Sequence, residues 1–148
     1  MSLRVYVPRD AAAIACGADA VATALEAEAR AAGVEITLVR NGSRGMLWLE
    51  PLVEVTAADG VRYGFGPVGA GDVAGLVAAG MLVRPEAVVH AAAIGAVERL
   101  PFMAGQTRLT FARCGLDDPL SIEAYVAGGG YAGLARAVAM TPEAIVAE

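Results

Sequence analysis

The chain has 148 residues, a net charge of −5 and 57% hydrophobic residues, many of them alanine. This length suits one domain with its own core, and the apolar content excludes a disordered chain. The apolar runs are too short for a membrane span, no export signal precedes them, and no basic cluster offers a footprint for nucleic acid. We therefore expect a cytoplasmic protein that binds neither a membrane nor a nucleic acid.

The first part of the chain has the pattern of a strand, a helix and a second strand. Residues 3–8 alternate apolar side chains and end at a proline, and residues 34–40 alternate in the same way. Between them, Asp10 opens an alanine-rich run in which apolar residues recur at helical spacing until Gly33. A strand–helix–strand unit predicts that the two strands are parallel.

Residues 51–57 and 61–66 are predicted to form a hairpin, because the turn sequence ADG separates two strand-like stretches. Residues 69–82 then predict a second helix. The order β-α-β followed by β-β-α is that of a thioredoxin-like domain. We therefore expect an α/β fold over residues 1–85, with two layers, a four-stranded mixed sheet and flanking helices.

After Pro85 the pattern changes. Residues 86–117 predict a connector with one short helix and an extended part, and residues 118–148 predict a series of helices. Asp118 is the expected N-cap of the first of these helices. The last helix, capped by Thr141, is only begun when the sequence ends. We interpret residues 118–148 as the helical start of a module that the chain does not contain.

Few side chains in this sequence are suited to chemistry. His90 is the only histidine, and Cys16 and Cys114 are expected to be two reduced thiols. Cys16 has neither a neighbouring base nor a CxxC partner. The glycine-rich stretches 41–45 and 64–72 match no phosphate-binding fingerprint and are expected to be structural turns. We predict no catalytic, cofactor-binding or metal-ligating residue in this chain.

The alternation around Pro51 places Trp48 and Leu52 on the face opposite Val53 and Val55. Two interpretations are open for the tryptophan. It packs under a helix, or it lies in a subunit contact, where aromatic anchors are common. We take Trp48 and Leu52 as the candidate subunit contact.

Four stretches together carry a resemblance to a known family: VYVPRDAAAIACGADAV (5–21), RNGSRGMLWLEPLVEV (40–55), RLTFARCGLDDPLSIEAY (108–125) and GGYAGLARAVAMTPEAIVAE (129–148). In this order they resemble the N-terminal part of the beta (diaphorase) subunit of soluble NAD-dependent formate dehydrogenases. In that family a thioredoxin-like domain precedes a module similar to the flavoprotein subunit of respiratory complex I.

The resemblance implies a parent complex that oxidises formate and reduces NAD⁺. FMN, NAD and a [4Fe–4S] cluster would be bound by the full-length parent subunit and not by residues 1–148. The implied partners are the catalytic molybdenum subunit and a small [2Fe–2S] subunit of the same complex.

The resemblance also implies which segment residues 40–55 correspond to in a ferredoxin. Thioredoxin-like ferredoxins bind a [2Fe–2S] cluster through two cysteine pairs, the second in a C-x-x-x-C segment followed four residues later by proline. Placed on SRGMLWLEP, this pattern puts Ser43 and Leu47 at the cysteine positions, and the first pair falls in residues 7–13, which contain no cysteine. Leucine cannot ligate iron. We therefore expect a ferredoxin-type fold without its cluster, retained as a scaffold or docking element.

Three alternatives stay open. The first is a free-standing thioredoxin-like interaction module, including a homodimer of this chain. The second is the equivalent domain in the diaphorase subunit of a NAD-reducing hydrogenase, because such subunits share the downstream architecture. The third is a thiol redox protein that uses Cys16.

Overall fold

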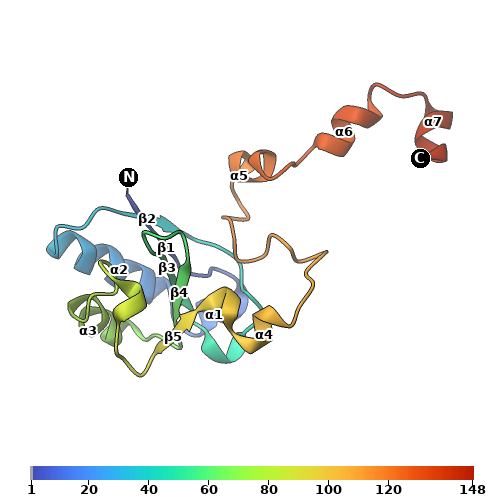
Figure 1. The fold of residues 1–148 in the computed structure, drawn as a ribbon. Helices are drawn as coiled ribbons and strands as arrows, with labels where there is room; N and C mark the ends of the chain where they lie inside the picture. Colours follow the sequence, from blue (N-terminus) through green and yellow to red (C-terminus); the bar gives the residue numbers. More distant parts are fainter. Residues whose placement is uncertain (1) are drawn as a thin grey trace.

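The computed structural model describes residues 2–148. One five-stranded sheet has the order β2-β1-β3-β4-β5 (Figure 1). The parallel pairing of β1 with β2 confirms the predicted strand–helix–strand unit, and the antiparallel pairing of β3 with β4 confirms the predicted hairpin. The strands are β1 (Leu3–Tyr6), β2 (Ile36–Val39), β3 (Val53–Thr56), β4 (Arg62–Phe65) and β5 (Ala93–Ala96).

Seven α-helices are seen in the described residues: α1 (Ala11–Ala15), α2 (Ala18–Ala31), α3 (Val73–Ala78), α4 (Pro101–Ala104), α5 (Ile122–Ala127), α6 (Ala132–Ala137) and α7 (Pro142–Ala147). Short 3-10 turns are η1 (Leu47–Leu49), η2 (Ala70–Asp72), η3 (Pro85–Ala87) and η4 (Val97–Arg99). None of the helices within residues 2–148 is long and apolar enough to cross a membrane.

The first predicted helix is divided in two. Asp10 caps α1 as expected, because its carboxylate accepts the backbone N–H groups of Ala12 and Ala13. Gly17 then takes a left-handed conformation, with φ at +98°, and separates α1 from α2. Periodicity alone did not reveal this break, because alanine suits either side of the turn.

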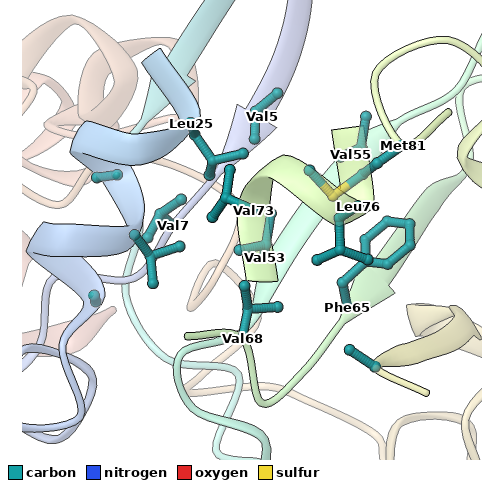
Figure 2. Packing of buried hydrophobic residues seen from close by; sticks show 14 of the residues in the cluster. Val5, Val7, Leu25, Val53, Val55, Phe65, Val68, Val73, Leu76 and Met81 are labelled. Carbon is teal, nitrogen blue, oxygen red and sulfur yellow. The ribbon is translucent and has the colours of Figure 1, made fainter. Parts of the chain in front are cut away.

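The main core lies between one face of the sheet and helices α2 and α3. Val5, Val53 and Val55 project from that face and pack with Leu25 of α2 and Leu76 of α3 (Figure 2). All five side chains are fully buried. Burying a side chain of this size stabilises a fold by about 1.5–3 kcal/mol. This cluster fixes the sheet and leaves its other face to be covered by the loop 40–51 and the segment after β5.

A smaller cluster covers part of the opposite face. Leu52 is fully buried there with Met46, Val97 and Met103. Gly64 of β4 is needed beneath this cluster, since a Cβ at that position would overlap the side chain of Val97. The turns η1 and η4 and helix α4 are therefore packed onto the sheet through a core of their own.

The fifth strand corrects the sequence prediction of a four-stranded sheet. Residues 93–96 pair antiparallel with β4, although we assigned them to the connector 86–117 with its short helix. The stretch AIGA is too short and too alanine-rich for periodicity to separate strand from helix. The short helix lies later, at α4. The sheet thus continues beyond residue 85 into the predicted connector.

Helices α5, α6 and α7 extend away from the sheet as an arm (Figure 1). The N-cap of α5 is Ser121, whose hydroxyl accepts an N–H of the first turn at 3.1 Å. Asp118 instead accepts the N–H of Leu120, in a turn before the helix, so the predicted Asp118 cap is wrong. The predicted Thr141 cap of α7 is confirmed by its hydrogen bond of 3.2 Å.

Candidate functional site

The loop between β2 and β3 is closed by hydrogen bonds of Ser43. Its hydroxyl donates to Glu50 Oε1 at 2.8 Å and accepts the N–H of Gly45 at 3.0 Å. Gly45 has a φ of +86°, which glycine adopts without the strain that a side chain would add. Ser43 therefore acts as a brace between the two ends of the loop.

Glu50 completes this brace from inside the protein. Only 5% of the residue is exposed, and its second carboxylate oxygen accepts the N–H of Leu52 at 3.0 Å. Burial raises the pKa of Glu50 above its usual range, and the hydrogen bonds from Leu52 and Ser43 offset only part of that effect. The negative charges of Asp10 and Glu54 raise the pKa further.

Behind the loop, Arg44 and Glu54 form a buried ion pair. The Arg44 guanidinium donates to both carboxylate oxygens of Glu54, at 3.0 and 2.8 Å, and its Nη1 lies 2.8 Å from Glu98 Oε1. Burial lowers the pKa of Arg44, but the hydrogen bond and charge of Glu54, with those of Glu98, more than offset this and leave the pKa raised. Arg44 is therefore held as a cation inside the fold.

Arg62 extends the ion pair to the segment after α4. It lies 3.6 Å from Glu54, and its guanidinium stacks over the ring of Tyr6 at 3.6 Å from the centroid. It also donates to the carbonyls of Gly115 and Leu116, at 2.7 and 3.0 Å. The sheet thus holds residues 115–116 through Arg62 of β4, which is itself positioned by Tyr6 of β1 and Glu54 of β3.

Asn41 adds a third bond to the same segment. Its side-chain amide donates to the Gly115 carbonyl at 2.9 Å, and the residue is fully buried. Gly115 has a φ of +82° and lies against Arg44, where a Cβ would overlap the Arg44 side chain. We call Asn41, Arg44, Glu54, Arg62 and Glu98 the polar clamp. The polar clamp was not predicted from the sequence, because a charged residue in an alternating strand normally indicates a solvent-facing side.

The two residues predicted as a subunit contact differ in exposure. Trp48 is 61% exposed and contacts Phe102 of α4 edge-to-face, with ring centroids 5.1 Å apart. Leu52 lies on the predicted face, opposite Val53 and Val55, but it is fully buried within the chain. Only Trp48 is therefore accessible to a partner. Trp48 therefore contacts helix α4 and remains largely exposed, and its part in a subunit contact stays a prediction.

The remaining candidate residues, Cys16, Cys114 and His90, come from three separate segments of the chain. Cys16 is exposed at the end of α1, and Cys114 is half-buried. His90 Nδ1 accepts the N–H of Ala92 at 3.1 Å, in the turn that precedes β5. Among residues 2–148, no cluster of three or more histidine, cysteine, aspartate or glutamate side chains is placed to hold a metal ion.

Comparison with solved structures identifies the fold class. A thioredoxin-like [2Fe-2S] ferredoxin from Aquifex aeolicus superposes with a TM-score of 0.52 and 16% identity, over 65% of this chain and 93% of the ferredoxin. The fold is thioredoxin-like. The wild-type thioredoxin-like [2Fe-2S] ferredoxin from Aquifex aeolicus gives a TM-score of 0.45 and 19% identity, over 67% of this chain and 94% of that one. No model of a protein family matches the chain. No curated protein matches it either.

The cluster implied by this fold class does not fit the residues present. The loop positions assigned to the second cysteine pair carry Ser43, whose hydroxyl is already engaged with Glu50 and Gly45, and Leu47, which has no donor atom. The loop that follows β1 contains no cysteine before Cys16. A [2Fe–2S] centre needs four ligands of thiolate or imidazole type. The chain supplies two cysteines and one histidine in all, and we derive no electron-transfer step through this loop.

Proposed function

We propose that this chain is the cluster-less, thioredoxin-like N-terminal part of the diaphorase subunit of a NAD-dependent formate dehydrogenase, and that it serves as a docking element. The observation that carries the proposal is the loop 43–47. In a fold shared with a [2Fe-2S] ferredoxin, this loop is braced by Ser43 and backed by the polar clamp. The proposal is that the chain has the ferredoxin-type fold, and that hydrogen bonds and ion pairs stabilise the loop 43–47 where a ferredoxin would bind its cluster.

The exposed surface beside this loop supports a docking role. Leu47, Trp48, Phe102, Leu109 and Phe111 are all exposed although each is large and apolar. Clusters of this kind are typical of protein contacts. In the proposed complex, formate is oxidised at the catalytic molybdenum subunit, and FMN, NAD and [4Fe–4S] are bound by the remainder of the diaphorase subunit. The part played by residues 1–148 is to hold neighbouring subunits in place.

The test is co-purification of a defined activity. The chain is tagged and purified from the organism that naturally produces it, and the eluate is assayed for formate-dependent reduction of NAD⁺. We expect that activity to co-purify with the wild type and to be reduced by Trp48→Ala, because the substitution removes a large exposed aromatic contact. Val89→Ala, which trims another exposed apolar residue, serves as the matched control and should leave the yield unchanged.

The same eluate separates the alternatives. Hydrogen-dependent instead of formate-dependent NAD⁺ reduction would assign the chain to a hydrogenase diaphorase subunit. Neither activity, together with a sedimentation mass of two chains, would indicate a free-standing module that forms a homodimer. An intact complex with undiminished formate activity in Trp48→Ala would remove the tryptophan from the docking contact.

A further inference from the structure

A groove lies between the loop 43–47 and the segment that runs from α4 to Cys114. Its volume is about 640 Å³, and its walls include Leu47, Phe102, Leu109 and Phe111. We call it the connector groove. It adjoins the polar clamp through Arg44, which is buried and contributes to the wall of the groove.

The walls of the connector groove are too open for a small ligand. Leu109 is 83% exposed and Phe111 is 64% exposed. Sites for small molecules usually enclose 70–90% of the ligand surface. An open apolar trough of this kind instead matches the interface of a protein, which covers the walls with its own side chains and excludes water from them.

The segment that lines the groove is positively charged, whereas the chain as a whole is negatively charged. Residues 99–114 contain three arginines and no carboxylate, in a chain whose net charge is −5. Arg113 pairs with Asp117 at 3.6 Å. Arg99 and Arg108 have no carboxylate partner anywhere in residues 2–148. Arg108 lines the groove itself, and its Nη1 donates a weak hydrogen bond to Met103 Sδ at 4.0 Å.

One end of the groove is held in position before any partner binds. Gly115 directly follows the lining residue Cys114, and its carbonyl is bonded by Asn41 and Arg62. At the other side, Arg44 contributes to the wall while its guanidinium is fixed by Glu54. A surface whose frame is fixed in advance loses less conformational entropy on binding.

From these observations we propose that the connector groove binds a segment of a partner protein in which a bulky apolar side chain is flanked by carboxylates. The apolar side chain fills the trough between Leu47 and Phe111, and a carboxylate pairs with Arg108. Two arginines without partners suit a short acidic segment and are far fewer than the contacts that nucleic-acid binding requires. The identity of the partner as a formate dehydrogenase subunit rests on the proposed function, whereas the groove and the chemistry of its occupant do not.

Two variants of the tagged chain test the groove in the same co-purification experiment. Phe111→Ser removes an apolar wall, and Arg108→Glu reverses the charge that should meet the carboxylate. We expect each variant to lower the co-purified formate-dependent activity at least about tenfold, which corresponds to about 1.4 kcal/mol of binding. The wild-type complex should also dissociate with rising salt, and Arg108→Glu should flatten that salt dependence.

Matched controls come from the segment that follows α3. Val83→Ser and Arg84→Glu make the same kinds of change at exposed positions away from the groove. Both should retain the partner as the wild type does. Thermal unfolding of all four variants confirms that any loss of partner is not a loss of fold.

The outcomes separate the groove from the proposed function. If the wild type retains formate dehydrogenase and both groove variants retain it equally, the groove inference is overturned and the proposed function stands. If the wild type retains no such activity, the proposed function and the named partner fail together. If Phe111→Ser instead converts a dimer of this chain into a monomer, the occupant is a second copy and the inference of a different partner is wrong.

Discussion

Arg44 and Glu54 form a bidentate ion pair inside the protein, with both side chains no more than 2% exposed. Glu54 lies on the middle strand, opposite Tyr6 of β1 and Gly64 of β4. An isolated charge at such a position would be strongly unfavourable, and each partner supplies the other's bidentate counter-charge. The pair joins the loop 40–51 to the sheet, and Arg62 joins the sheet to residues 115–116.

The first prediction concerns the carboxylate of the clamp. Glu54→Gln keeps the shape but leaves two arginines without their buried counter-charge, so we expect a loss of about 3–5 kcal/mol in the free energy of unfolding. Urea unfolding measures this loss. Asp59→Asn, at an exposed turn, should change stability by less than about 0.5 kcal/mol. A stability for Glu54→Gln within that smaller range would show that the ion pair is not needed.

Coupling between the two partners gives a second prediction. Arg44→Met alone should also be costly, because it leaves Glu54 paired only with Arg62, at 3.6 Å. The double variant Arg44→Met, Glu54→Gln should lose less stability than the sum of the two single losses. Either single change already breaks the ion pair, so the second change does not break it again. A double-mutant cycle in urea measures the coupling energy. Strict additivity would argue that the two side chains do not stabilise each other.

Gly115 gives a third prediction, with a control from the same chain. Gly115→Ala adds a Cβ that would overlap Arg44, at a φ of +82°. Gly60 has nearly the same φ, +81°, but open space around its Cβ position. We expect Gly60→Ala to cost about 1 kcal/mol from backbone strain alone, and Gly115→Ala to cost about 1–3 kcal/mol more. Equal costs in thermal or urea unfolding would mean that Arg44 does not press on this glycine.

The buried Glu50 gives a prediction about pH. Because its pKa is raised in the folded state, the folded protein holds the proton more tightly than the unfolded chain. The stability that this provides is complete below the usual value of 4.5 and is lost as the pH rises through the folded pKa. Glu50→Gln does not titrate, and its Oε1 can still accept the N–H of Leu52 while its Nε2 donates to Ser43 Oγ. The stability of the variant relative to the wild type should therefore increase as the pH rises from below 4.5 through the folded-state pKa of Glu50. A difference that does not change with pH, or that changes in the opposite sense, would contradict this.

The sequence was sufficient for the main sheet and insufficient for the clamp. Alternating apolar residues located β1 to β4, because one face of each strand is buried against α2 and α3. The strand β5 was missed, since its four residues carry no distinctive alternation. Glu54 was missed for a different reason. Its burial depends on Arg44 and Arg62, and a pairing between a loop and two strands leaves no local signal in the sequence.

The candidate contact shows the same limit. Alternation correctly placed Leu52 opposite Val53 and Val55, yet it could not reveal that Met46, Val97 and Met103 cover Leu52. Long-range packing decides exposure. Trp48 lies in the short turn η1, where the two-residue period of a strand does not apply, and its exposure could not be derived from that period.

Iron and sulfide analysis measures directly whether the loop 43–47 holds an iron–sulfur cluster. The chain is produced in cells with active iron–sulfur assembly, purified without oxygen, and analysed for iron, acid-labile sulfide and visible absorption. We predict no stoichiometric iron or sulfide and a colourless protein that unfolds at the same temperature with or without an iron chelator. One [2Fe–2S] cluster per chain, with an absorption spectrum to match, would contradict the proposal that Ser43, Glu50 and the polar clamp hold this loop in place of a cluster.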